Sequence, residues 1–174
     1  NDKDLKATLK KFDEMGDLLS IQEFKGISSW SKYLSIRRPK EAAIYDFRVA
    51  YSINAINLLN NETAFMFPMP NSRSSRLGLL CLESLFVQSN MMNAPNFVSR
   101  ADLDLPKFAA TIKKRFCISD KEAYSTYLKL LKQVVKKLEP NLPDVDILKI
   151  EMLLFALAPK NILYDVYEKC GMKA

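Results

Sequence analysis

The sequence predicts an all-α protein, folded as one compact domain of several helices over residues 1–174. Apolar residues recur at spacings of three and four in most segments, which is the periodicity of amphipathic helices. Only four glycines occur, too few for a sheet protein rich in tight turns. With 48% hydrophobic residues the chain can bury one core but not two. Because it begins at Asn1 rather than methionine, we expect a trimmed N-terminus.

Composition narrows the chemistry that this chain can perform. Histidine is absent, which removes histidine acid–base catalysis, Ser–His and Cys–His nucleophiles, and most zinc and haem sites. We therefore expect neither a metal nor a cofactor. The cysteines Cys81, Cys117 and Cys170 form no CxxC pair and suit a reducing cytosol, so we expect a cytoplasmic protein. No apolar run approaches the roughly 18 residues of a membrane span.

The N-terminal third is expected to hold three helices before a central one. An amphipathic helix over residues 2–15 ends near Gly16, and a short one follows at residues 18–24. The third begins at a Ser28 or Ser29 cap and stops before Pro39.

Asp46 is a good N-cap for a helix over residues 47–59. Few polar residues interrupt that helix, so it is predicted to be buried and central, with Asn60-Asn61 at its end. Residues 65–70 contain two prolines and cannot form a regular helix. An apolar run of this kind either fills a groove between helices, or wedges into nucleic acid or contacts a partner.

The C-terminal half is predicted to be helical as well. Its helices are expected at residues 77–86, 105–115, 119–138 with a Ser119–Glu122 capping box, 144–157, and after Pro159 with Asn161 as cap.

Lys32 and Asp46 are the residues that suggest chemistry. At 100° per residue Lys32 lies about 200° from Trp30, so it points away from the packed helix face. A nucleophilic lysine must be partly desolvated, and a nearby carboxylate can pair with it or stabilise a cationic sugar. The structural alternative is that Lys32 is a solvated lysine and Asp46 is only a cap.

The pattern S-K-Y-L-x(4)-P-x(4)-I-Y-D-x-R-V-A, from Ser31 to Ala50, resembles the catalytic region of helix-hairpin-helix DNA glycosylases, in particular the 8-oxoguanine glycosylase branch. The resemblance implies a glycosylase-like helical fold, with Lys32 as the nucleophile that attacks the sugar and Asp46 as its carboxylate partner. The superfamily has Gly-apolar-Gly just before the lysine, whereas Gly26-Ile27-Ser28 keeps only the first glycine. Bacterial proteins linked to phage defence look similar over the same stretch.

The formal net charge of +6 permits binding to a phosphate backbone. The predicted phosphate ligands are the basic residues around the Pro39 break: Lys25, Arg37, Arg38, Lys40 and Arg48. The alternative interpretation is that these basic residues form a solvated charge cluster around a turn. Trp30 is predicted to stack on a base, as aromatic residues do in flipped-base pockets, or else to be a core residue.

Together these observations predict a DNA-binding protein that resembles 8-oxoguanine DNA glycosylases and excises a base through a lysine Schiff base. The alternative is a catalytically inactive protein of the same fold that binds a protein partner, as an accessory protein of phage defence would. An unrelated helical interaction domain is a third interpretation.

Overall fold

The computed structural model describes residues 2–62, 65–71, 77, 81–93, 99 and 108–171. The all-α prediction is confirmed: helices dominate this part of the chain, and the only β pairing in it is an isolated bridge between Met66 and Cys117. The elements are α1 (Asp2–Glu14), the 3₁₀ turn η1 (Leu18–Ser20), α2 (Ile27–Arg37), α3 (Phe47–Leu59), α4 (Leu82–Asn93), α6 (Phe108–Phe116), α7 (Ala123–Leu138), α8 (Ile147–Leu157), the π-helical turn η3 (Ala158–Ile162) and α9 (Leu163–Lys169).

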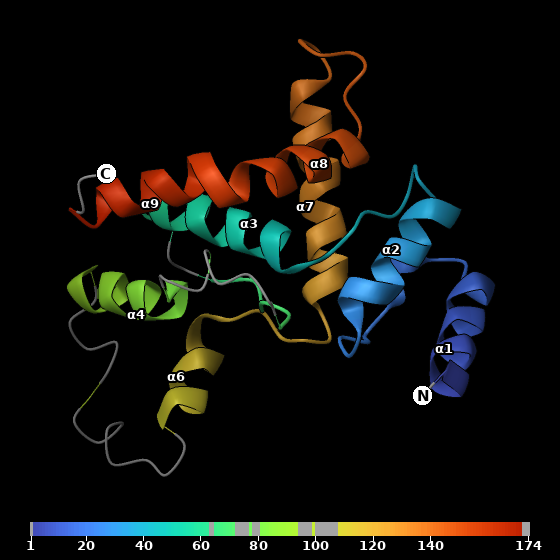
Figure 1. The fold of residues 1–174 in the computed structure, drawn as a ribbon, viewed down its shortest axis with the longest axis horizontal. Coiled ribbons are helices and arrows are strands. Elements are labelled where there is room, and N and C mark those ends of the chain that lie inside the picture. Colours follow the sequence, from blue (N-terminus) through green and yellow to red (C-terminus); the bar gives the residue numbers. More distant parts are fainter. Residues whose placement is uncertain are drawn as a thin grey trace.

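Helix α3 is the central element, as its apolar composition predicts. It packs against α8, η3, α9 and α4, and the continuous run from α8 to α9 lies along it in Figure 1. Asp46 is its N-cap, and its Oδ1 accepts the Val49 N–H at 3.1 Å. Asn60 is its C-cap, followed by Asn61 with a φ of 60°. The expected bounds of this helix are therefore confirmed at both ends.

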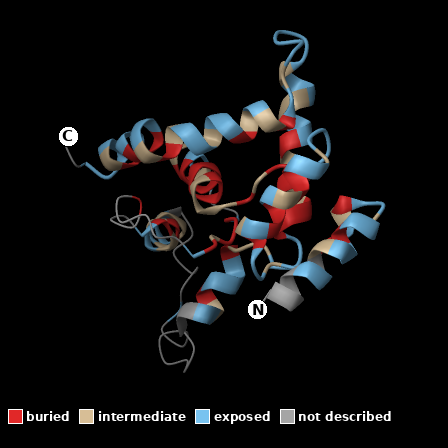
Figure 2. Ribbon diagram, turned by 45° about the vertical axis from the view of Figure 1, so that its right-hand side comes forward, coloured by how far each residue is buried: buried red, intermediate tan, exposed pale blue. Residues whose placement is uncertain are grey.

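Two hydrophobic clusters meet at α3, and Figure 2 shows the buried residues between the helices. The first cluster is aromatic and joins α1, α2 and α7. In it Trp30 contacts Phe12 and Tyr124, with ring centroids 4.9 and 4.7 Å apart. The second cluster joins the far half of α3 to α4, α6 and α9. The first of these clusters supports the N-terminal end of α3.

The loop at residues 65–71 fills a groove, which confirms one of its two predicted uses. Met66 and Phe67 are buried, while Phe65 is half exposed. Asn54 of α3 binds the loop at two points: its Nδ2 donates to the Phe67 carbonyl at 2.8 Å, and its Oδ1 accepts the Phe67 N–H at 2.7 Å. These bonds satisfy backbone groups that a buried loop would otherwise leave unpaired.

The predicted break at Pro159 is wrong, because the helix continues through it. Residues Ala158–Ile162 form a π-helical turn with Pro159 at its start, and α9 follows directly. A proline lacks an N–H donor and its ring crowds the preceding turn, and a locally wider π turn removes that conflict. Asn161 therefore lies inside the turn and does not cap a helix.

Several helix starts also differ from the predictions. Helix α2 starts after Gly26, which has a φ of +71°, so neither Ser28 nor Ser29 is its cap. Ser119 begins a tight turn in which its carbonyl accepts the Glu122 N–H. Helix α7 begins only at Ala123, so Ser119 does not cap it.

The predicted bounds also differ for α4, α6 and α8. Asp146, rather than Asp144, caps α8. Helix α4 starts at Leu82, and residues 78–80 of the helix predicted there lie outside the described part of the chain. Residues 105–107, which were predicted to begin the next helix, also lie outside it, and α6 is described from Phe108. None of the described helices is long and apolar enough to span a membrane.

Candidate active site

The short segment from Ala42 to Asp46 carries the chain from α2 to α3 and is fixed from one side by α7. The Tyr124 hydroxyl donates to the Ala43 carbonyl at 3.1 Å, and the Tyr127 hydroxyl donates to the Ile44 carbonyl at 2.8 Å. Both rings are buried. Burial, and after it the charge of Glu151, raise the pKa of Tyr127 well above its usual value, so this hydroxyl stays protonated and remains a donor.

Helix α2 holds the same segment from the other side. The backbone N–H of Tyr45 donates to Ser31 Oγ at 3.0 Å, and both residues are buried. Lys32 follows Ser31 in sequence, and Asp46 follows Tyr45. The start of α3 is therefore bound to α2 at the residues next to the two predicted catalytic groups. Sequence separation alone does not specify this contact, which depends on the serine that precedes the lysine.

Lys32 and Asp46 differ in their exposure to solvent. Lys32 is exposed, as its angular position on α2 predicts, and Asp46 is partly buried. One Asp46 oxygen is engaged by the Val49 N–H. Its carboxyl group lies at the positive N-terminal end of the α3 dipole. The desolvation that a lysine nucleophile needs must therefore come from a bound substrate that covers the Lys32 amine.

Glu151 on α8 is a third ionisable member of this site, and the sequence predictions missed it. The residue is only 2% exposed, and its Oε2 has no hydrogen-bond partner among the described residues. Burial and then the Asp46 carboxylate raise the pKa of Glu151 from 4.5 to about 7, against the lowering effects of a backbone hydrogen bond with Ile44 and of Lys32. The charges of both predicted catalytic residues therefore affect the pKa of Glu151, although Lys32 lies on α2 and Asp46 at the start of α3.

A sequence signal for Glu151 does exist. It lies four residues after Ile147 and seven before Ala158, and both of these residues are buried. Helical periodicity therefore places an acidic side chain on the apolar face of α8. A buried carboxyl group with one oxygen left without a hydrogen-bond partner is rare enough to indicate a functional role.

The three groups together provide the elements of acid–base and nucleophilic chemistry. Burial raises the pKa of Glu151 to about 7, so this carboxyl group can hold a proton near neutral pH. Lys32 carries an exposed amine, and a lysine nucleophile would require neither metal nor cofactor. Among the described residues, no group of three or more cysteine, aspartate or glutamate side chains could hold a metal ion. Comparison of the chain with protein-family models, with curated proteins and with solved structures gives no match.

The prediction that Trp30 stacks on a base is wrong. The Trp30 residue is 1% exposed, its ring packs between Phe12 and Tyr124, and its Nε1 donates to the Lys25 carbonyl at 3.2 Å. A base could reach the indole only if the aromatic cluster came apart. The core alternative for this residue is therefore confirmed.

Arg38, another predicted phosphate ligand, is engaged within the protein. Its guanidinium donates to the Met15 and Gly16 carbonyls at 2.8 and 3.0 Å and to Glu41 at 2.5 Å. The two carbonyls follow the C-terminal end of α1, where a cation is favoured by the helix dipole. Arg38 therefore binds α1 to the Pro39 turn.

The other predicted phosphate ligands lie at the surface or at its margin. Lys25 and Lys40 are exposed, and Arg37 makes a 3.6 Å ion pair with Asp13 while its side chain remains 61% exposed. Arg48, the second residue of α3, is partly buried and stacks its guanidinium 4.6 Å from the Phe155 ring centroid on α8. These four side chains remain candidates for a basic surface.

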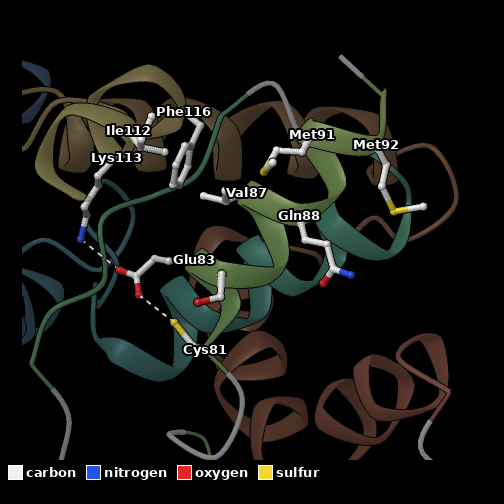
Figure 3. A pocket seen from close by; sticks show the side chains of 10 residues that line it. Cys81, Glu83, Val87, Gln88, Met91, Met92, Ile112, Lys113 and Phe116 are labelled. Atoms are coloured by element: carbon white, nitrogen blue, oxygen red, sulfur yellow. Dashed lines mark hydrogen bonds and ion pairs between the residues drawn. The ribbon is translucent and has the colours of Figure 1, made fainter. Parts of the chain in front are cut away.

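A separate pocket of about 810 Å³ is lined by residues of α4 and α6, and Figure 1 shows these two helices on the other side of the molecule from α2. Figure 3 shows its apolar lining and, at its rim, the 3.0 Å ion pair between Glu83 and Lys113. None of the predicted site residues lines this pocket. The cluster of Lys32, Asp46 and Glu151, which we call the lysine–carboxylate site, remains the better candidate for chemistry.

Proposed function

We propose that this chain is a DNA-binding protein of the 8-oxoguanine glycosylase type, which excises a damaged base at the lysine–carboxylate site. The observation that carries the proposal is the hydrogen bond from the Tyr45 N–H to Ser31 Oγ, which ties together the backbone next to Lys32 and Asp46. The resemblance over Ser31–Ala50 supplies the substrate class. The exposed basic residues Lys25, Arg37 and Lys40 agree with a polyanionic partner.

In the proposed reaction the Lys32 amine attacks the sugar carbon C1′ and forms a carbon–nitrogen bond. The N-glycosidic bond breaks, its electron pair leaves with the base, and the base takes up one proton. The nitrogen lone pair then forms the C=N bond as the C1′–O4′ bond breaks and its electron pair leaves with O4′. The two protons lost from nitrogen balance those taken up by the base and by O4′, and the product is a Schiff base. The Asp46 carboxylate stabilises the positive charge that develops on the sugar as the base departs.

Reductive trapping tests this proposal. The protein is incubated with duplexes that each carry one damaged base, 8-oxoguanine first, in the presence of borohydride. The Schiff base predicts a covalent protein–DNA product in the parent protein and its complete loss in Lys32→Gln. The matched control is Lys10→Gln, which removes an exposed lysine from α1 and should leave trapping unchanged. Failure of the parent to form an adduct with any damaged duplex contradicts base excision.

An inactive binding protein of the same fold is the second candidate, and the turn before α2 favours it. Gly26 is present in the left-handed conformation, but Ser28 stands where the glycosylase hairpin has its second glycine. A side chain there restricts the approach of a DNA phosphate to the backbone amides. This candidate predicts a protein partner, as in phage defence, and no borohydride adduct. DNA binding without an adduct would favour it over the enzyme.

A further inference from the structure

We propose that the outward face of α7 is a second surface for nucleic acid, which holds the sugar–phosphate backbone of a duplex without regard to sequence or damage. Its members are three lysines that we call the lysine stripe: Lys129, Lys132 and Lys136. The stripe is separate from the lysine–carboxylate site. This inference therefore goes beyond base excision and can be tested on undamaged DNA.

The stripe lies on the opposite face of α7 from the residues that hold the candidate site. Tyr127 donates its hydroxyl hydrogen to the Ile44 carbonyl at 2.8 Å, so its side of the helix faces the segment that enters α3. At about 100° per residue, the three lysines lie about 200°, 140° and 180° around the helix from Tyr127. All three are exposed. The stripe therefore faces away from the segment that carries Asp46.

The positive charge of this face is not compensated within the helix. Helix α7 carries four lysines and no acidic residue, and the acidic residues Glu122 and Glu139 lie only at its two caps. None of the stripe lysines forms an ion pair with a described residue, whereas Arg37 and Arg38 near the Pro39 turn both do. The helix dipole favours cations in the last turn, but it gives no reason for the lysines in the middle of α7.

The composition of the face favours a nucleic-acid backbone over a protein or a membrane. The uncharged residue among the three lysines is the exposed and polar Gln133, and none of the exposed large hydrophobic side chains belongs to α7. Protein interfaces are depleted in lysine, and helices that bind anionic membranes insert apolar residues. Lysine is a point charge that contacts a phosphate without reading bases. From Lys129 to Lys136 the helix rises about 10 Å, which is the rise of about three nucleotides along one strand.

Fluorescence anisotropy with an undamaged duplex at about 50 to 200 mM salt tests the stripe. One variant replaces all three stripe lysines by glutamine. The matched control replaces three exposed lysines of α1, with the same loss of formal charge: Lys6→Gln, Lys10→Gln and Lys11→Gln. Loss of the stripe should weaken binding about tenfold or more at about 100 mM salt and reduce the slope of log Kd against log salt by about 2–3, whereas the control should change the slope by less than about 1. Equal slopes in the two variants overturn the proposal, as does a parent protein that does not bind the duplex.

A footprint of the parent protein tests the stripe without any variant, so that a folding defect cannot hide the result. Amines are acetylated with an N-hydroxysuccinimide ester, with and without the duplex, and are read by peptide mass spectrometry. DNA should protect the stripe lysines about threefold or more over Lys6 and Lys10, and equal protection overturns the proposal. Polyglutamate that displaces the duplex at an equal concentration of charge overturns the assignment to nucleic acid. Stripe protection without a borohydride adduct would reject base excision alone, and an adduct without stripe protection would reject the stripe alone.

Discussion

The backbone N–H of Tyr45 donates a 3.0 Å hydrogen bond to the hydroxyl of Ser31, and both residues are buried. The hydroxyl also lies 3.5 Å from the Tyr45 carbonyl, at the limit of a weak second bond. This pair joins α2 to the start of α3 across fourteen positions of sequence. The relative placement of Lys32 and Asp46 therefore depends on a serine that itself has no chemical role.

Ser31→Ala should destabilise the protein by about 1–3 kcal/mol, because it leaves the buried Tyr45 N–H without an acceptor. Urea denaturation followed by circular dichroism measures the loss in free energy of unfolding. Ser29→Ala is the matched control: it changes an exposed serine on the same helix and should cost less than about 0.5 kcal/mol. Equal effects of the two substitutions would show that the Ser31–Tyr45 bond does not hold the site together.

Asn54→Ala should cost about 2–4 kcal/mol in unfolding free energy, because two buried backbone groups of Phe67 lose their partner at once. The comparison is Asn57→Ala on the same helix, where the asparagine is only partly buried. Thermal and urea unfolding of both variants measure the difference. A loss below about 1 kcal/mol for Asn54→Ala would mean that the 65–71 loop does not depend on α3.

Replacements of the adjacent arginines should have different consequences. Arg38→Ala should lower stability by about 1–3 kcal/mol, since a charged donor to the Met15 and Gly16 carbonyls is lost. Arg37→Ala should change stability by less than about 0.5 kcal/mol, because its ion pair is largely exposed. Fluorescence anisotropy with duplex DNA at about 50 to 200 mM salt should show weaker binding and a smaller salt slope for Arg37→Ala. Greater weakening of DNA binding by Arg38→Ala, at unchanged stability, would contradict the assignment of Arg38 to the α1 contact.

The ionisation of Glu151 should make the protein less stable as pH rises. A carboxyl group whose pKa is raised on folding binds its proton more tightly in the native state, so the stability present below the unfolded value of 4.5 is lost as pH rises through about 7. The shift corresponds to about 3 kcal/mol of unfolding free energy. Urea denaturation at pH 4.5, 6, 7 and 8 should show this loss in the parent but not in Glu151→Gln. Parallel pH profiles for the two proteins would exclude a raised pKa at Glu151.

The elements that could be predicted from the sequence are those with a strong apolar period and a local cap. Helix α3 is the clearest case, because Asp46 and Asn60 both act within a few residues of its ends. The predictions failed where a cap or a helix break indicated by the sequence was replaced by a different local backbone conformation. At Ser119 a tight turn took the place of the capping box, and at Pro159 a π turn kept the helix continuous.

In the candidate site as well, features set by local sequence could be predicted, and features set by distant contacts could not. The position of Lys32 on the exposed face of α2 follows from helical periodicity alone. The roles of Trp30 and Arg38 do not follow from helical periodicity. Each depends on contacts with residues in α1 or just after it, which are far away in sequence. Glu151 was missed because its partners lie more than 100 positions earlier in the chain. Only the packing of α8 against α3 brings it to Asp46.

The central claim is that Lys32, Asp46 and Glu151 form one electrostatic site, and carboxyl ¹³C NMR titration of Glu151 tests it most directly. The structure predicts a pKa of about 7 for Glu151 in the parent protein. Asp46→Asn should lower this pKa because a repelling carboxylate is removed, and Lys32→Gln should raise it because an attracting ammonium is removed. A Glu151 that titrates near 4.5 and responds to neither substitution would contradict the claim.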